Sequence, residues 1–334
     1  MTDRGQRPSV IGLTSTVPVE IIFAAGMRPV DINNLFIASD RPEKYVSQAE
    51  AAGFSHNICS WIKGIYSAVL DHGIKDVIAV TGGDCSNTIA LAEILARRGV
   101  RIIPFDFPLN RDREFLGAQM ENLRLSLSTT WEAINETKSR LDGIRRKLRK
   151  LDRLTFEKNL VTGLENHIFL VCSSDFESDP DRFEKKLDHL LLEAETRKPG
   201  RDEVRLGYLG VPPIFSDFYQ HIESMGARVV FNEVQRQFSM PFDTEDIVEQ
   251  YLQYTYPYGV DGRIEDIKRA VADRNLDGLI HYTQTFCFRQ LYDIILRTEM
   301  PVPVLTLEGD RPGKIDSRTS LRLETFIEML RGIK

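Results

Sequence analysis

The stretch Thr81-Gly82-Gly83-Asp84-Cys85-Ser86-Asn87-Thr88 lies between an apolar run and a segment with helical spacing. The run before it, Asp76 to Val80, predicts a buried parallel strand, and Thr88 to Arg98 predicts a helix. Cys85 therefore falls in a strand-to-helix turn, at the edge where open α/β sheets bind ligands. Because free N–H groups at a helix start create a positive local field, we expect this position to favour the thiolate form of Cys85.

The same arrangement occurs twice more along the chain. Cys59 opens a predicted helix that runs to Leu70, and Cys287 follows the predicted strand Leu276 to Tyr282 and opens another helix. Three of the four cysteines thus begin helices beside a predicted sheet edge. We predict that Cys59, Cys85 and Cys287 converge on one iron–sulfur cluster. Three thiolates on a [4Fe–4S] cluster leave one iron open, and an open iron can act as a Lewis acid.

Two other interpretations of the cysteines remain open. A lone cysteine is usually a small buried hydrophobe, and we favour that interpretation for Cys172, which lies in an apolar run. Zinc held by three thiolates and a water is the alternative metal site. No histidine or carboxylate stands at a ligand-like spacing from Cys59, Cys85 and Cys287, and this favours the cluster over zinc.

Composition limits the class of protein. The chain has 334 residues, 42 % of them hydrophobic, which suits two domains, or two and an insertion. Its net charge of −6 gives no indication of a nucleic-acid partner. No apolar run reaches transmembrane length, the N-terminus lacks a secretory signal, and the cysteines do not form a disulfide pattern. We therefore expect a cytoplasmic protein that does not interact with membranes.

Alternating strand and helix patterns predict the fold class, α/β with two mostly parallel sheets. We expect a first α/β domain at 1–112, a helical insert or connector at 113–200 and a second α/β domain at 201–334. Apolar residues from Leu116 to Leu151 follow three- and four-residue steps, which indicates one long helix or two in a hairpin. A cofactor is expected in the cleft between the two sheets.

The long helical segment becomes strongly basic between residues 140 and 158. The simpler interpretation is a solvated helix face. The alternative is a docking surface for an acidic partner or for ligand phosphates.

Polar residues near the predicted sheet edges are candidates for a site. Ser15 ends the first strand and could bind substrate or a cluster sulfide, or cap the strand. Glu20 is a candidate acid, base or substrate-orienting group, although an acidic residue also suits the first turn of a helix. Asp84 either faces the site or caps a helix. His281 is expected to be a hydrogen-bonded core histidine.

Motifs for nucleotide and zinc-protease chemistry are absent. The chain has no G-x-x-x-x-G-K-[ST], no G-x-G-x-x-G after its first strand and no H-E-x-x-H. ATP hydrolysis by this chain is therefore not expected.

Taken together, several pieces of the sequence resemble the 2-hydroxyacyl-CoA dehydratase D-component family, which includes benzoyl-CoA-reductase-like and double-cubane-cluster proteins. They occur in the family's order over nearly the whole chain. The pieces are Ser15-Thr16-Val17-Pro18-Val19-Glu20-Ile21-Ile22-Phe23-Ala24-Ala25-Gly26, the Cys59 helix start, the Cys85 turn, Asp277-Gly278-Leu279-Ile280 leading to Cys287, and Leu305-Thr306-Leu307-Glu308-Gly309-Asp310 running on to Arg318, Arg322, Glu324 and Phe326.

The resemblance implies two Rossmann-like domains with a helical piece and a cubane at the domain cleft. The family's cluster ligands correspond to Cys59, Cys85 and Cys287. It also implies an oxygen-sensitive lyase that performs reductive radical dehydration of a 2-hydroxyacyl-CoA. A separate ATP-hydrolysing activator would supply low-potential electrons.

Two alternatives to that function remain. One is a homodimeric reductase or electron-transfer protein with a double-cubane [8Fe–9S] cluster and no CoA substrate. The other is a scaffold without enzymatic activity. The sequence also leaves open whether the chain forms a homodimer or pairs with a paralogous second subunit.

Overall fold

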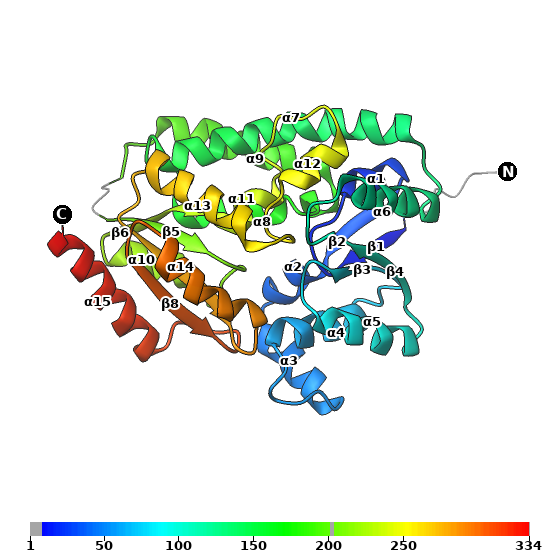
Figure 1. The fold of residues 1–334 in the computed structure, drawn as a ribbon, viewed down its shortest axis with the longest axis horizontal. Coiled ribbons are helices and arrows are strands. Elements are labelled where there is room, and N and C mark those ends of the chain that lie inside the picture. The colour runs from blue at the N-terminus through cyan, green and yellow to red at the C-terminus, as the bar shows by residue number, and fades with distance from the viewer. Residues whose placement is uncertain (1–8, 201–203, 334) are drawn as a thin grey trace.

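The chain forms two parallel four-stranded sheets with the same strand order, in a computed structural model that describes residues 9–200 and 204–333 (Figure 1). The orders are β2-β1-β3-β4 and β6-β5-β7-β8. This confirms the predicted α/β class with two parallel sheets. The strands of the first sheet are β1 (Val10–Leu13), β2 (Arg28–Asp31), β3 (Asp76–Gly82) and β4 (Arg101–Asp106). Those of the second are β5 (Val204–Leu209), β6 (Ala227–Asn232), β7 (Gly278–Gln284) and β8 (Val304–Gly309).

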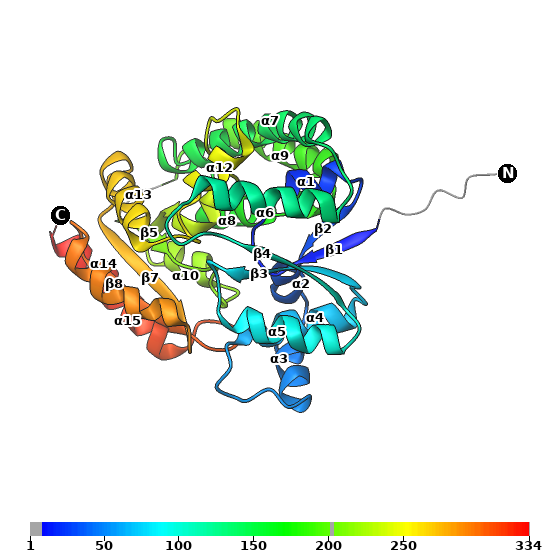
Figure 2. The ribbon, with the colours of Figure 1, turned by 45° about the vertical axis from the view of Figure 1, so that its right-hand side comes forward.

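Helices cover both faces of the first sheet, which is why its strands are apolar on both sides. In β3, Ile78 and Val80 pack on one face and Val77 on the other. Figure 2 shows α6 on one side of this sheet and α4 and α5 on the other. The helices are α1 (Val19–Ala24) and α6 (Arg113–Ser126) on the first face, and α2 (Ile32–Ile37), α3 (Pro42–Ala51), α4 (Ser60–Asp71) and α5 (Asn87–Arg97) on the second.

The second sheet is covered in the same way. Leu206 and Ile280 pack with one set of helices, and Leu209 and Leu279 pack with the other. The first set is α10 (Phe218–Ser224) and α15 (Ser317–Ile333), and the second is α13 (Val260–Asp273) and α14 (Asp293–Glu299).

The predicted helical segment is two helices, because α6 ends at Ser126 and α7 (Trp131–Phe156) begins after a short turn. With 26 residues, α7 is about 39 Å long, and it runs past both sheets (Figure 1). Two further helices follow, α8 (Gly163–Cys172) and α9 (Pro180–Thr196), with the short 3₁₀ turn η1 (Phe176–Ser178) between them. The apolar run that ends at Cys172 is thus helical.

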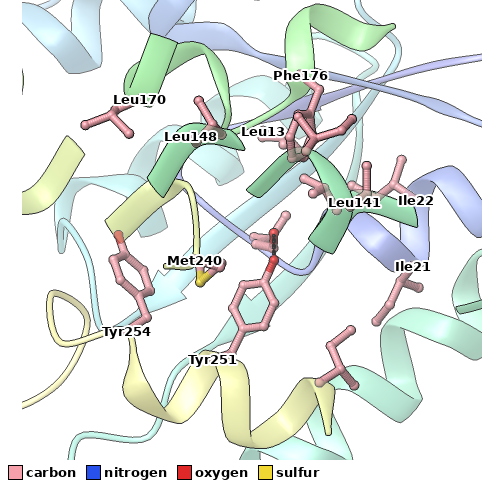
Figure 3. Close-up of a cluster of buried hydrophobic side chains, with 14 of the residues drawn as sticks. Leu13, Ile21, Ile22, Leu141, Leu148, Leu170, Phe176, Met240, Tyr251 and Tyr254 are labelled. Carbon is pink, nitrogen blue, oxygen red and sulfur yellow. Dashed lines mark hydrogen bonds between the residues drawn. The ribbon is translucent and has the colours of Figure 1, made fainter. Parts of the chain in front are cut away.

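The core of the first half receives residues from both halves of the chain. Figure 3 shows Leu141 of α7 close to Ile22 of α1 and Leu148 of α7 close to Leu170 of α8, and all four belong with Tyr251 to one buried cluster. Tyr251 lies on α12 (Ile247–Gln253), which follows β6 and the short helix α11 (Glu233–Phe238). The Asp246 side chain caps the start of α12 by accepting a hydrogen bond from the Glu249 N–H.

Most charges of the basic segment at 140–158 are paired within the protein. Arg140 pairs with Asp181, Lys150 pairs with Glu195, and both acids lie on α9. Lys147 Nζ lies 2.7 Å from carboxylate oxygens of Glu184 and Asp188, also on α9. This face of α7 is therefore largely an ion-pair interface with a neighbouring helix.

No helix within residues 9–200 and 204–333 has the length and apolar character needed to cross a bilayer.

Candidate functional site

Cys59, Cys85 and Cys287 line one mostly apolar cavity of about 160 Å³. A single water needs about 15 Å³ by this kind of measure, so the space suits a group of several atoms. Two of the thiols come from the first half of the chain and one from the second. The structure therefore places the three cysteines at one cavity, and Cys172 is not among the lining residues.

Sheet topology explains why these residues meet. In each sheet the first strand lies between the second and third, so neighbouring connections run to opposite faces and leave a crevice at the carboxyl ends of the strands. The cavity lies where these two crevices face each other. Its lining follows the strand ends: Thr14, Ser15 and Thr16 after β1, Asp31, Asn33 and Asn34 at the end of β2 and just after it, Asp84 and Cys85 after β3, Val211, Pro212 and Pro213 after β5, Val234 and Phe238 after β6, and Cys287, Phe288 and Arg289 after β7.

Helix starts direct backbone N–H groups toward the thiols, as expected, but burial outweighs them. The N–H groups of Trp61 and Ile62 approach the Cys59 sulfur. Burial nevertheless raises the pKa of Cys59 to about 12 and that of Cys85 to about 11, and the other thiols add repulsion. The helix starts therefore favour the thiolates, as expected, but burial disfavours them more strongly. A cation among the three sulfurs would supply the missing stabilisation, since a metal deprotonates a coordinating thiol.

Cys287 precedes a 3₁₀ turn, η2 (Phe288–Tyr292), rather than the predicted α-helix. Two residues later, Arg289 is only 7 % exposed. Its guanidinium lies 3.9 Å from the centre of the Tyr256 ring, and its Nη2 donates a hydrogen bond to the Gly83 carbonyl oxygen at 3.0 Å. Arg289 thus links the loops that carry Cys287 and Cys85.

The glycine pair before Cys85 permits a close approach between chain segments. Gly83 has φ +87°, and a Cβ atom there would lie 2.7 Å from both the Pro257 carbonyl oxygen and the Phe107 Cβ. Only glycine fits this conformation and this space. The backbone therefore brings the Cys85 turn against a segment of the second half.

The three thiols are a donor set that an iron–sulfur cluster could use. In the part of the chain that the structure describes, no three His, Cys, Asp or Glu side chains are close enough together to hold one metal ion. In a cubane each thiolate binds a different iron, so its sulfur ligands lie farther apart than around one zinc. Three cavity-facing thiols with adjacent N–H donors match that donor set.

Ser15 and Asp84, two residues singled out from the sequence, both line the cavity. Burial raises the pKa of the Asp84 carboxyl, while the nearby Arg289 charge and a hydrogen bond from Ser15 oppose that shift. The cap of α5 is Ser86 rather than Asp84. Ser15 and Asp84 therefore form a polar corner of the cavity.

Glu20 lies elsewhere. Its carboxylate is fully buried, 2.7 Å from the Arg145 guanidinium, and accepts hydrogen bonds from Gln250 Nε2 at 2.8 Å and Tyr251 Oη at 2.9 Å. It is not among the residues that line the cavity. This placement favours a structural role, the second of the two interpretations of Glu20.

Neither Cys172 nor His281 lines this cavity, although His281 lines a small neighbouring pocket together with Cys287. Cys172 packs against the core around α7, and burial raises its pKa to about 12. His281 is 1 % exposed, with Nδ1 at 3.0 Å from Asp293 Oδ1, which confirms the expected core histidine.

Several lining residues escaped prediction from the sequence. Asp31 ends β2 and Asn33 and Asn34 follow it, so a polar group at a strand end was a usable signal. His167 lies on α8, and no pattern in the sequence singled it out. No local pattern pointed to Arg289.

Fold and site together define an α/β protein of two doubly wound halves with a three-cysteine centre where the carboxyl ends of their sheets meet. The sequence model for the D-component of 2-hydroxyglutaryl-CoA dehydratase matches residues 14–330, nearly the whole chain. The protein belongs to this family. A comparison with individual curated proteins gave no significant match.

Proposed function

We propose that this chain is the iron–sulfur component of a 2-hydroxyacyl-CoA dehydratase-type enzyme. In this proposal Cys59, Cys85 and Cys287 hold a [4Fe–4S] cluster, and a separate ATP-hydrolysing activator delivers the electrons. The observation that carries the proposal is the meeting of three thiols from both halves of the chain at one cavity, in a member of this family.

When bound, the cluster would supply one-electron reduction and an open iron that polarises an oxygen atom. The chain's own residues prepare the space around it. Backbone N–H groups of the α4, α5 and η2 starts stabilise the three thiolates. Apolar groups, including Trp61 and Ile62, exclude water from the cavity.

Ser15 is the candidate for contacting substrate. Its hydroxyl lies at the cavity wall beside Asp84, which accepts its proton in a hydrogen bond. A substrate carbonyl or hydroxyl in the cavity would lie within reach of this polar corner.

One observation favours the alternative of a double-cubane reductase or electron-transfer protein without a CoA substrate. Among the described residues that line the cavity, Arg289 is the single cationic side chain, and it already contacts Tyr256 and Gly83. CoA phosphates would therefore need cations from outside this cavity or from another subunit.

An exposed apolar patch supports a second subunit, either another copy or a paralogue. Phe288, Leu291 and Ile294 follow Cys287 at intervals of three residues and are 43 %, 69 % and 72 % exposed. In a 3₁₀ turn residues three apart share a face, so Phe288 and Leu291 point the same way, beside the site. All four cysteines are free, which suits a reducing cytoplasm.

The deciding experiment is to measure iron and acid-labile sulfide per chain after strictly anaerobic purification, with an EPR spectrum of the reduced protein. About four irons and four sulfides per chain are expected for one cubane. A small excess of sulfide over iron would support a bridged double cubane. Zinc, or a metal-free protein of normal stability, would contradict both and favour a scaffold.

If iron and sulfide are present, the next experiments are assays of acyl-CoA binding and of dehydration in the presence of an activator protein. Binding and turnover would support the dehydratase, whereas full cluster content without binding of any acyl-CoA would favour the reductase.

A further inference from the structure

His167 of α8 is the one histidine among the described residues that line the cavity. Two features fix its position. Thr162 and Glu165 form a reciprocal capping box at the start of α8. A Cβ atom on Gly163 would lie 3.0 Å from the Val229 carbonyl oxygen, so α8 packs tightly against β6. The imidazole therefore reaches the cavity from a rigid helix.

A series of hydrogen bonds connects His167 to a buried ion pair. This ion pair determines which group donates and which accepts in each bond of the series. Arg274 donates to Asp152 from Nη1 at 3.0 Å and from Nη2 at 2.5 Å. The Arg274 charge keeps the pKa of the buried Asp152 carboxyl below its usual value, so this group is ionised and can only accept. Asn166, 3.1 Å from Asp152 Oδ1, must therefore present its Nδ2 amide group.

The orientation of the Asn166 amide then determines the donor and the acceptor in each of the following hydrogen bonds. With Nδ2 used, Asn166 Oδ1 accepts from Asn232 Nδ2 at 2.9 Å. Asn232 Oδ1 consequently accepts the Tyr219 hydroxyl at 2.7 Å. Tyr219 has one hydroxyl proton, which is now committed. Its oxygen lies 2.9 Å from His167 Nδ1 and must accept a proton from that nitrogen.

The remaining ring nitrogen of His167 is thereby defined. Burial lowers the pKa of His167 to about 3, so the ring is neutral and carries one N–H. Because this N–H is on Nδ1, Nε2 holds a bare lone pair. No hydrogen bond to Nε2 is formed within residues 9–200 and 204–333.

We propose that His167 Nε2 is a preorganised acceptor that binds the hydroxyl group of a hydroxyacyl ligand in the cavity. The choice of a hydroxyacyl ligand rests on the proposed function. The locked tautomer does not, because it follows from the hydrogen-bond chain alone. A bare acceptor in a largely apolar cavity stays unsatisfied when the ligand lacks a hydroxyl, so the deoxy analogue binds more weakly. His167 would thus determine specificity, with Tyr219 as its positioning residue.

The tautomer is tested by NMR on the full-length chain labelled with ¹⁵N in its histidine rings. Two-bond ¹⁵N–¹H correlations show which ring nitrogen carries the proton, and His167→Gln identifies the His167 signals by their loss. We expect a neutral, Nδ1-protonated ring from pH 6 to 8, and a shift toward the Nε2-protonated form in Tyr219→Phe. An Nε2-protonated or titrating His167 in the unsubstituted protein, or a Tyr219→Phe pattern identical to it, would overturn the inference.

Hydroxyl recognition is tested by calorimetry with a 2-hydroxyacyl-CoA and the acyl-CoA that lacks only the hydroxyl. We expect the first to bind about fivefold to tenfold more tightly, the effect of one hydrogen bond. His167→Phe should remove the preference, and His167→Gln, whose amide oxygen can accept, should keep part of it. Equal binding of both ligands overturns hydroxyl recognition and leaves the dehydratase proposal intact. Binding of neither overturns both, and the tautomer result still stands by itself.

Discussion

Arg289 and Gly83 are joined across the two halves of the protein by a hydrogen bond from Nη2 to the carbonyl oxygen at 3.0 Å. Arg289 lies two residues after Cys287, and Gly83 lies two residues before Cys85. The bond therefore sets the separation of two proposed cluster ligands. Because the guanidinium also packs on the Tyr256 ring, it is held from two sides.

Replacing this arginine tests the link. Arg289→Ala should lower the free energy of unfolding by about 1.5–3 kcal/mol, because a buried carbonyl loses a charged donor. It should also lower iron content, since the Cys287 loop loses its anchor. Urea denaturation and metal analysis measure the two effects.

Arg322→Ala is the matched control. Arg322 Nη2 also donates to a carbonyl oxygen, that of Thr306 at 2.7 Å, but at the protein surface. Its loss should cost well under 1 kcal/mol, because water replaces the lost donor. Equal effects of the two substitutions would show that the interdomain link contributes nothing of its own.

The ligand assignment predicts the behaviour of four cysteine variants. Cys59→Ala, Cys85→Ala and Cys287→Ala should each lose most bound iron, since each removes one thiolate from the cavity. Cys172→Ala should retain its iron, because Cys172 packs against the core outside the cavity lining. Iron loss from Cys172→Ala as large as from the other three would disprove the assignment.

Local patterns revealed most of the fold and the three thiols. The apolar run at β3 and the helical spacing after it placed Cys85 in its turn, because both signals extend over only a few residues. A strand-to-helix turn in an α/β sheet then predicts the cavity edge from general topology. These features could be predicted because the residues that determine them are neighbours in the sequence.

The remaining features depend on contacts between distant segments. Arg289 bonds to a residue 206 positions away, and no periodicity encodes that partner. Arg145 belonged to a basic run that suggested a solvated face, yet it is 2 % exposed and pairs with Glu20. Val234 also lines the cavity, because the chain turns directly from β6 into α11 at Glu233.

A substitution in the buried pair of Glu20 and Arg145 can show whether Glu20 has a structural or a catalytic role. Glu20→Gln should destabilise the protein by about 3–5 kcal/mol, because Arg145 is left as a buried charge without its main partner. The melting temperature and the urea midpoint report this loss. Normal stability combined with lost activity would instead support the catalytic role that the sequence suggested.

Asp181→Asn provides the surface comparison, because the partner of Asp181 lies on the same helix as Arg145. Asp181 pairs with Arg140 of α7, and the side chains of Asp181 and Arg140 are 77 % and 46 % exposed. An exposed pair of this kind contributes less than about 1 kcal/mol, so this variant should unfold almost like the unsubstituted protein.

Asp31 and Asp175 form a carboxylate pair at the cavity margin, and this pair predicts a pH dependence of stability. The Asp31 N–H donates to Asp175 Oδ2 at 2.7 Å, and the Ser174 hydroxyl donates to Asp31 Oδ2 at 2.7 Å. Burial raises the pKa of Asp175 to about 7, and the charges of Asp31 and Glu177 add to the shift. The fold therefore favours the protonated form of Asp175.

The direction of this pH dependence follows from the number of protons bound by the folded and the unfolded chain. Between pH 4 and 7 the unfolded chain has released the Asp175 proton while the folded protein retains it, so stability falls as pH rises. The slope for one proton is at most about 1.4 kcal/mol per pH unit. Above pH 7 this contribution is constant. Asp175→Asn removes the titration, so its stability relative to the unsubstituted protein should increase from pH 5 to pH 7 and then level off.

Glu50→Gln serves as the control, because the contribution of Glu50 to stability has the opposite pH dependence. Hydrogen bonds from Lys63 and Arg311 lower the pKa of Glu50 to about 2, so its stabilisation is complete at neutral pH and is lost as pH falls toward 2. Urea midpoints at half-unit pH steps distinguish the two variants. A difference between Asp175→Asn and the unsubstituted protein that stays flat from pH 5 to 8 would mean that Asp175 is already ionised at the cavity margin. Asp31 would then face a permanent neighbouring charge, and the cavity would disfavour an anionic ligand on that side.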